Sequence, residues 1–290
     1  AQLFERALSG SLEELQHRHE HSTEQVLREL GFSDAMLERF FRPFLGGIFL
    51  RRDLSNSSRM LDFVFRMLAS GATTLPARGM GAIPAQLAAA LPAHCVRLNC
   101  EVATVRRDAV TLAGGERVTA SAVVVATEGD VAARLLGWRN KPAALGVLNV
   151  YFAAPHSPVE GPDLVLNGEG TANGPVNVLS CPSDVAPSYA PRGQALVSVQ
   201  VLEFAGDDAA LERAVRAQLS GWYGAHIVER WRLLRIDRIR FAQPAQPVGA
   251  LEPAARPVRL DGGLYVCGDH REDASIDGAL RSGRRAALAV

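Results

Sequence analysis

Several features common in other proteins are missing from this sequence, and each absence removes a class of function. The 290 residues carry 31 basic and 31 acidic side chains, so the formal net charge is zero and no basic surface for nucleic acid is indicated. No apolar run approaches the roughly 20 residues that span a bilayer. The four cysteines form no C-x-x-C pair, which favours free thiols. Because the residues also open with no signal-peptide pattern, we expect a cytoplasmic protein.

The phosphate-binding turn of dinucleotide folds, Gly-x-Gly-x-x-Gly, is absent as well. Residues 262–288 nevertheless read as part of a dinucleotide site. A short apolar strand ends at Gly268 and Asp269, and Ser275 is a suitable N-cap for a helix that begins at Ile276. The carboxyl end of a strand beside the N-terminus of a helix is where open α/β sheets bind such ligands.

The small residues of this last helix allow two interpretations. Gly278, Ala279, Ser282 and Gly283 leave the helix thin, so that its backbone can approach a phosphate or a ring. The same residues would also serve close packing of the helix on a sheet, with Gly278 and Gly283 at the contact. The residues alone leave binding and packing equally open.

The rest of the chain alternates between two kinds of sequence pattern. Residues 1–75 predict helices, with capping patterns at Ser11 and Ser22, and the helix 57–70 is apolar except for a narrow polar stripe, so it is either mostly buried or borders an apolar cavity. Later helices are expected at 85–91, 130–136 and from Asp208, and strands at 102–106, 109–112, 118, 122–127 (fully buried), 145–153, 176–180, 195–202, 233–241 and 264–267. This alternation indicates two interleaved domains.

Aromatic and histidine residues near the N-terminus have simpler explanations than a site. Phenylalanines at helical spacing favour a core over a pocket, and they are Phe40, Phe41, Phe44, Phe49, Phe63 and Phe65. His17 and His21 share a helix face but His19 lies opposite, so we expect no metal. His270, which follows Asp269, is expected to be a solvated loop residue rather than a neighbour of a ligand.

Four segments together carry a family resemblance. The run Gly263-Leu-Tyr-Val-Cys-Gly-Asp269, continuing through Ser275-Ile-Asp-Gly-Ala279, resembles the C-terminal flavin-binding motif of the flavin-containing amine oxidase and phytoene desaturase superfamily. Three further segments agree in order and spacing: Arg78-Gly-Met-Gly-Ala-Ile-Pro84, the stretch around Val102, and Val123-Val-Val-Ala-Thr127. Residues 1–75 are similar to the substrate domain of the desaturase-like branch.

The resemblance implies FAD as the cofactor and transfer of hydride from a substrate C–H to flavin N5. The Ile276 backbone N–H is then the neighbour of the flavin N1–C2=O2 edge, Asp269 holds a ribityl or pyrophosphate-side hydroxyl, and Asp277 points away from phosphate. No catalytic nucleophile and no metal ligand is implied. The cofactor-binding residues are Val102, Ala126, Thr127, Gly268, Asp269, Ser275, Ile276, Gly278 and Ala279.

These observations predict an α/β fold in which an incomplete FAD/NAD(P)-binding-type domain is interleaved with a substrate domain of mixed sheet plus helices. The expected divisions are 1–75 and 141–241 for the substrate domain and 76–140 and 242–290 for the FAD segments. We expect the C-terminal portion of an FAD-dependent oxidoreductase with an apolar or amine small-molecule substrate. FAD retention by these residues alone should be weak, unless an N-terminal FAD-binding piece is supplied, and self-association is possible. The alternative is a flavin-free remnant that serves as an apolar-ligand binder or interaction subunit.

Overall fold

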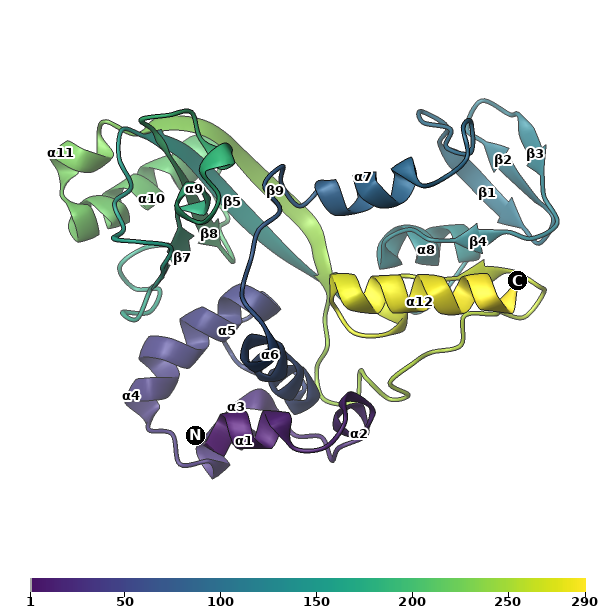
Figure 1. The fold of residues 1–290 in the computed structure, drawn as a ribbon, viewed down its shortest axis with the longest axis horizontal. Coiled ribbons are helices and arrows are strands. Elements are labelled where there is room, and N and C mark those ends of the chain that lie inside the picture. The colour runs from purple at the N-terminus through teal and green to yellow at the C-terminus, as the bar shows by residue number, and fades with distance from the viewer. Residues whose placement is uncertain (1) are drawn as a thin grey trace.

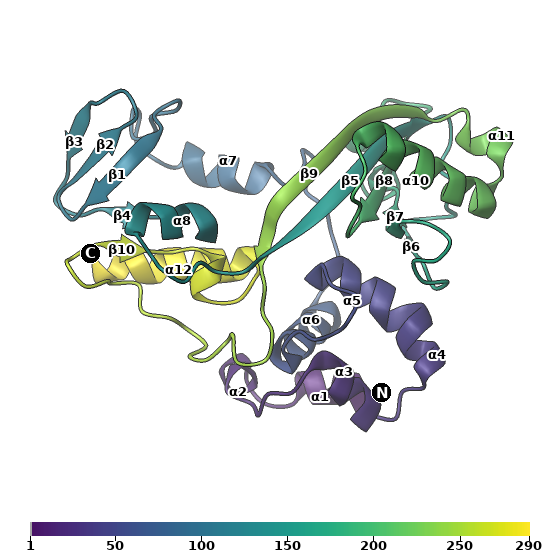
Figure 2. The ribbon, with the colours of Figure 1, turned by 180° about the vertical axis from the view of Figure 1, so that it is seen from behind.

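The computed structural model describes residues 2–290, so that Ala1, the first residue of the expected helical segment, lies outside the described residues. Three groups of elements are visible in Figures 1 and 2: a helical layer, a long antiparallel sheet, and an open α/β part that contains the C-terminus. In residues 2–290 no helix is long and apolar enough to cross a membrane.

The helical layer is built from the first 70 residues, as predicted. Its elements are α1 (Gln2–Leu8), α2 (Leu12–Gln16), α3 (Thr23–Glu29), α4 (Asp34–Met36), the π-helical turn η1 (Leu37–Phe41), α5 (Arg42–Phe49) and α6 (Ser58–Ser70). Ser11 forms the complete capping box with Glu14. Ser22 accepts from the Gln25 N–H at 3.1 Å, but the Gln25 side chain donates to Glu29 instead, so only half of the second predicted box forms.

The polar stripe of α6 turns inward rather than toward solvent. The Asp62 carboxylate is fully buried and accepts from Arg6 at 2.8 and 2.9 Å and from Arg18 at 2.8 Å. Arg59, also buried, donates to the backbone oxygens of Arg18 and Leu251. The sequence predicts that this helix is either mostly buried or borders an apolar cavity, and the structure shows both. The first two thirds of α6 are mostly buried, and Met60 borders a cavity.

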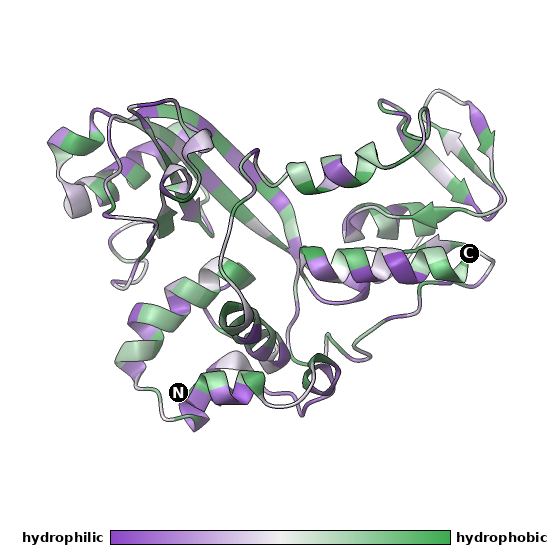
Figure 3. Cartoon of the chain, in the orientation of Figure 1, coloured by the Kyte–Doolittle hydropathy of each residue, from purple (hydrophilic) through white to green (hydrophobic). Residues whose placement is uncertain are grey.

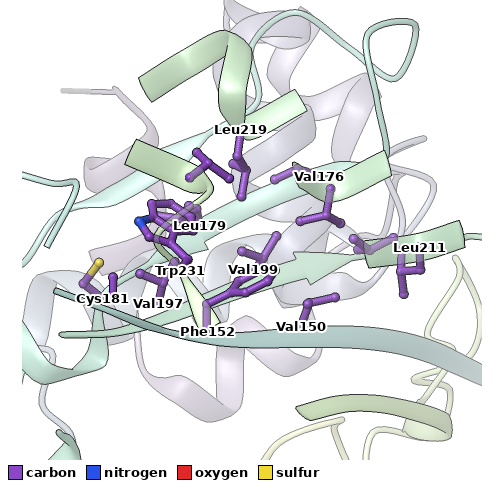
Figure 4. Packing of buried hydrophobic residues seen from close by; sticks show 14 of the residues in the cluster. Val150, Phe152, Val176, Leu179, Cys181, Val197, Val199, Leu211, Leu219 and Trp231 are labelled. Carbon is purple, nitrogen blue, oxygen red and sulfur yellow. The ribbon is translucent and has the colours of Figure 1, made fainter. Parts of the chain in front are cut away.

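The sheet carries the largest core. It contains β5 (Ala144–Ala154), β6 (Leu164–Leu166), β7 (Val176–Ser180), β8 (Ala195–Val201) and β9 (Arg232–Pro244), in the order β6-β7-β8-β5-β9. Between them run α9 (Pro182–Val185), the 3₁₀ turn η2 (Pro187–Tyr189), α10 (Asp208–Tyr223) and α11 (Ala225–Val228). Helix α10 begins at Asp208 as predicted, with Asp207 as its N-cap, and its residues Leu211, Val215 and Leu219 pack on the sheet (Figure 4).

Every neighbouring pair in this sheet is antiparallel, so the expectation of a mixed sheet at 141–241 is wrong in that detail. A long crossover of the kind that joins parallel strands does run from β8 through α10 to β9. However, β5 lies between these two strands and pairs in opposite sense with both, so no parallel strands are neighbours. The only parallel pairing within residues 2–290 lies elsewhere, between β4 and β10.

One glycine decides how closely the helical layer approaches the sheet. A Cβ at Gly47 in α5 would stand 3.1 Å from Gln200 Oε1 and 3.2 Å from a Val178 methyl group. The Gln200 side chain donates to the Gly47 oxygen at 2.9 Å, and the Asn177 side chain donates to the Pro43 oxygen at 3.1 Å. The side chains of β7 and β8 therefore hold α5 through its backbone.

The α/β part is assembled from two distant stretches of chain, which agrees with the predicted interleaving. The first stretch gives α7 (Ala82–Ala89), the meander β1 (Val102–Arg106), β2 (Ala109–Leu112) and β3 (Arg117–Thr119), then β4 (Val124–Val125) and α8 (Gly129–Leu136). The second gives β10 (Tyr265–Val266), the 3₁₀ turn η3 (Asp269–Arg271) and α12 (Ile276–Ala289). Helix α7 begins three residues before the predicted start.

The predicted fully buried strand at 122–127 is wrong. Only Val124 and Val125 form a ladder, and Val124 is 39% exposed while Val125 is buried. The physical reason is that β4 and β10 form a two-stranded sheet whose apolar contacts lie on one face, where Val125 packs with Ala132 and Val266. Side chains alternate between faces along a strand, so the other face stays open.

Candidate functional site

The carboxyl ends of β4 and β10 lie at one edge, because the two strands are parallel with Tyr265 opposite Val124 and Val266 opposite Val125. Gly268 follows β10 with a φ of +144°, and a Cβ there would stand 3.4 Å from the Thr127 backbone oxygen. The predicted residues Ala126, Thr127, Gly268 and Asp269 are thus brought together at this edge, as the strand pattern required.

Helix α12 begins beside the same edge. The Gly268 N–H donates to the Ser282 hydroxyl at 2.8 Å, which ties the end of β10 to the second turn of the helix. Ser275 is the N-cap and accepts from the Gly278 N–H at 2.8 Å. Within the described chain neither the Ile276 nor the Asp277 N–H has a protein acceptor. These two donors, with the positive end of the helix dipole, form an anion-accepting edge.

Acidic side chains near this helix start are paired mainly with one arginine. Arg281 pairs with Glu272 at 2.9 Å, with Asp277 at 2.8 Å, and with Asp273. Burial lowers the pKa of Arg281, but the charges of Asp273, Glu272 and Asp277 outweigh it and hold that pKa above the ordinary value. Asp277 therefore faces Arg281 along the helix surface.

The glycines of α12 have different surroundings. A Cβ at Gly278 would stand 2.3 Å from the Asp273 backbone oxygen, so this glycine is required by the loop that precedes its own helix. A Cβ at Gly283 would meet no atom within 4 Å. The packing interpretation thus holds for Gly278 only, and Gly283 leaves an open strip of backbone on the helix.

Asp269 and His270 occupy unlike environments. The Asp269 carboxylate is part-exposed and accepts from the His270 N–H at 2.8 Å. The prediction that His270 is a solvated loop residue is wrong, since the residue is only 5% exposed. Its ring lies 6.2 Å from the Trp138 ring in an edge-to-face arrangement, because the turn η3 folds it back beneath α8.

Val102 and Ala279 are the two remaining predicted cofactor residues, and neither lies at the carboxyl ends of β4 and β10. Val102 begins β1 opposite Leu112, and the register of that ladder shifts between Val102 and Thr104. Val105, on the same strand, packs against the Val125 and Val266 cluster, which sets β1 beside β4 and β10. Ala279 donates its N–H to the Ser275 oxygen in the first turn of α12. Among the described residues, no backbone hydrogen bond outside regular elements joins Val102 to the other predicted residues.

A cavity of about 170 Å³ opens next to the start of α12. We call it the apolar cavity, and its walls are Ile48, Phe49, Arg51, Asn56, Met60, Phe63, Val64, Leu145, Gln243, Pro244, Gln246, Pro247, Ala274 and Ser275. Phe49 and Phe63 belong to the aromatic stretch that was expected to be core. Phe41 and Phe65 are core as expected, whereas Phe49 and Phe63 also line this cavity.

Gln246 is the residue that the sequence reasoning missed. Its side chain accepts from the Ala274 N–H at 3.1 Å and donates to the Glu272 oxygen at 3.2 Å, and its own backbone oxygen accepts from the Ser57 N–H at 2.8 Å. It thereby clamps the loop before α12 to the start of α6. The sequence signal that could have identified Gln246 is the repeated Gln-Pro pair in Gln243-Pro-Ala-Gln-Pro247, which follows the predicted strand at 233–241.

The remaining candidate groups are the cysteine thiols and the side chains able to bind a metal. All four cysteines are free, and burial raises the pKa of the Cys181 and Cys267 thiols, which makes them poor nucleophiles. In residues 2–290 no cluster of three or more His, Cys, Asp or Glu side chains is arranged to hold a metal.

The comparison with protein families agrees with this geometry. The family model described as flavin containing amine oxidoreductase matches residues 4–290, so the chain belongs to that family of FAD-dependent oxidoreductases. No curated protein matches the sequence significantly.

Solved structures show the same fold at low sequence identity. An oxidoreductase from Methanosarcina mazei is 15% identical with a TM-score of 0.70, over 96% of this chain and 70% of that one. A putative protoporphyrinogen oxidase from Exiguobacterium sp. 255-15 is 16% identical with a TM-score of 0.68, over 98% and 70%. A reduced UDP-galactopyranose mutase is 14% identical with a TM-score of 0.62, over 89% and 66%.

Proposed function

We propose that this chain carries the substrate site and the flavin-facing half of the FAD site of an oxidoreductase. In this proposal residues 76–140 and 242–290 form the FAD segments and residues 1–75 and 141–241 the substrate domain. The observation that carries it is the meeting of two features at Ser275: the N-cap of α12, with its free N–H donors, also lines the apolar cavity.

The residues present fit a flavin nucleotide. The N–H groups of Ile276 and Asp277 are unpartnered within the described chain, and the strip at Gly283 is open to a flat group. Thr127, Gly268 and Asp269 share the strand edge at which a ribityl chain or pyrophosphate is held in α/β folds. Ala126 and Ala279 are small enough to allow close approach, whereas Gly278 is packed against Asp273 and supports the loop before α12. Val102 is assigned to the adenine by resemblance.

When bound, the flavin supplies the chemistry, by accepting hydride at N5 from a substrate C–H. The chain contributes placement and electrostatics. The Ile276 N–H lies where it would stabilise negative charge on the flavin N1–C2=O2 edge, because a preorganised donor there needs no reorganisation. Gln246 positions this helix start by holding residues 272–274 against α6.

The wall of the apolar cavity indicates the substrate class. Its only ionisable side chain is Arg51, and no Asp or Glu lines it. A protonated amine in this cavity would lose its hydration without gaining a carboxylate partner, which is costly. We therefore favour a neutral, largely apolar substrate over a cationic amine.

The predicted absence of a Gly-x-Gly-x-x-Gly turn bears on cofactor retention. Without this turn these residues grip the ADP phosphates poorly, and we expect them to hold FAD weakly until such a segment is supplied in the same chain or as a second piece. The cofactor test should therefore be run both on the 290 residues and on a version with an added N-terminal Gly-x-Gly-x-x-Gly segment.

The N–H donor of Ile276 offers a sharp test. Ile276 is the first residue of α12, and Ser275 before it has φ −145° and ψ 163°, so Ile276→Pro removes the N–H at a position where proline folds readily. We expect FAD to bind at least ten times more weakly, as measured by flavin fluorescence titration. Ile276→Ala keeps the N–H and should bind like the parent.

Asp208→Pro, at the first residue of α10, controls for proline at a helix start far from the site. If Ile276→Pro and the parent retain FAD equally, the proposed contact is wrong. If the version with the added segment stays colourless and takes up no FAD, the oxidoreductase proposal fails. The flavin-free apolar-ligand binder is then the remaining explanation for the cavity.

A further inference from the structure

A second cavity lies where the chain passes between the long sheet and the α/β part. Its volume is about 410 Å³, within the range of about 300–1,000 Å³ typical of small-molecule sites. We call it the basic cavity, and its walls are Trp138, Asn140, Lys141, Pro142, Ala143, Pro244, Ala245, Gln246, Pro247, Ala250, Arg256, His270, Arg271 and Glu272. None of the nine predicted cofactor residues lines it.

The charges on this wall do not balance. Lys141 is exposed and pairs with Asp130 at 3.2 Å. Glu272 is the only acidic residue on the wall. Its carboxylate forms ion pairs with Arg285 at 2.6 Å and with Arg281 at 2.9 Å, neither of which lines the cavity. Arg256 and Arg271 have no carboxylate partner in residues 2–290 and donate only to backbone oxygens, of Ala250 and Pro257 respectively.

The two unpaired arginines are held close together. The Arg256 N–H donates to the Arg271 backbone oxygen at 2.9 Å, which holds the two backbone segments side by side. The Arg271 guanidinium carbon lies 5.5 Å from the centre of the Trp138 ring. Burial lowers the pKa of Arg271, and the charges of Arg256 and Arg285 lower it further. An anion between Arg256 and Arg271 would relieve this repulsion.

Two residues that line this cavity, His270 and Arg271, carry buried polar atoms without partners. Both ring nitrogens of His270 and Nε of Arg271 are buried, and no atom of the described chain forms a hydrogen bond with them. Asp269 does not serve, because its carboxylate oxygen lies 3.8 Å from His270 Nδ1. A buried polar group without a partner costs about 1–3 kcal/mol, so native proteins rarely keep three of them together.

We propose that the basic cavity is a binding site for a small oxyanion, a phosphate or a carboxylate, held by Arg256, Arg271 and His270. Arginine recognises both groups through paired N–H donors, and an imidazole N–H can complete the site. A metal cation is excluded by the positive wall, and an apolar ligand would leave the arginines and the histidine unpaired. The Gln243–Pro247 segment separates this cavity from the apolar cavity, since Pro244, Gln246 and Pro247 line both.

The proposal is tested without FAD. Thermal unfolding of the purified chain is followed with increasing sodium phosphate, with sodium acetate, and with sodium chloride at matched ionic strength. Phosphate, acetate or both should raise the melting temperature in a saturable way that chloride does not reproduce. Comparing the two oxyanions tells which class of headgroup the site prefers.

Three variants locate the effect. Arg256→Gln removes a half-exposed charge and should weaken oxyanion binding at least tenfold. His270→Phe replaces the orphan nitrogens with an apolar ring of similar shape, so the free protein should keep its stability while the anion effect falls. Arg284→Gln removes an exposed arginine of α12 that lines neither cavity, and it should bind like the parent.

An oxyanion effect no larger than that of chloride would overturn the proposal. So would equal losses in Arg256→Gln and Arg284→Gln, because that result means non-specific screening. Since none of these readouts involves flavin, a failure here leaves the proposed oxidoreductase function standing, and the reverse also holds.

Discussion

Two valine-rich strands of this molecule have opposite surroundings. In β7, Val176, Val178 and Leu179 are all buried, because α10 covers one face of the sheet and α5 approaches the other. In β4, Val124 is 39% exposed although its neighbours in the sequence are equally apolar. Local composition therefore selects a strand, while burial depends on what the rest of the chain lays over it.

The contrast extends beyond these strands. Figure 3 shows hydrophobic residues along α7 and α12, and the exposed apolar side chains of the α/β part include Met80, Leu87, Leu91, Ile276, Leu280 and Leu288. The sheet part instead gathers its apolar residues into one large cluster (Figure 4). Apolar surface left open on this scale is typical of a face that meets a ligand or another protein segment.

The first prediction compares a substitution in the five-stranded sheet with one in the α/β part. Phe152→Ala, in the core of the sheet, should lower the free energy of unfolding by about 3–5 kcal/mol, because it removes a fully buried ring from a closed cluster. Val124→Ala should cost under about 1 kcal/mol, since its side chain is already half in solvent. Urea denaturation of both variants measures the difference, and equal losses would contradict the comparison.

Asp62→Asn is expected to have the next largest effect. The substitution removes the buried charge that faces Arg6 and Arg18 and leaves both guanidinium groups without their carboxylate. We expect a loss of about 3 kcal/mol, the lower end of the range for a broken buried pair, because both arginines reach solvent. Asp53→Asn, which disrupts an exposed pair with Arg51, is the matched control and should cost under about 1 kcal/mol.

Amide hydrogen exchange should show that the five-stranded sheet is more stable to local opening than the two-stranded sheet. Amides of β7 and β8 are expected to exchange about a hundredfold more slowly than those of β4, a difference of about 2.7 kcal/mol in opening free energy, because β4 is half of a two-stranded sheet. Mass spectrometry of peptides from the two regions gives the rates. Similar protection in both would mean that the open face of β4 is covered in solution.

The smallest effect concerns pH. Burial, and to a lesser extent Cys181, raises the pKa of Tyr223 to about 12. The folded protein then holds the phenol proton more tightly than the unfolded chain, whose tyrosine pKa is about 10. This contribution to stability is complete below about pH 10 and is lost as the pH rises toward 12. Tyr223→Phe should lose less stability than the parent between about pH 9 and pH 11; an identical alkaline loss would contradict this cause.

Much of the fold was predictable where the signal is local. The cap at Ser275, the helical stop at Gly137 and the strand at 176–180 all follow from a few adjacent residues, and each occurs as predicted. The site edge was predictable for a related reason: Thr127 and Gly268 each end an apolar run, and parallel strands align their carboxyl ends. Whether the predicted residues bind FAD stays a prediction for the titration to decide.

What could not be predicted depended on distant contacts. His270 is buried because Trp138 and Gly129, far away in the sequence, close over it. The role of Gln246 exists only because three segments meet at this one residue, two through its side chain and backbone together. The direction of the α6 stripe was likewise hidden, since Arg6 comes from α1 and Arg18 from the loop between α2 and α3.

The sequence by itself determined most of the helices and strands and the family motifs, because propensity, capping and strand ends are properties of neighbouring residues. Only the tertiary structure decided which apolar residues are covered, which charges are paired and where the cavities lie. Burial and charge compensation arise between residues far apart in the chain, and these determine the surroundings of α12, the apolar cavity and the basic cavity.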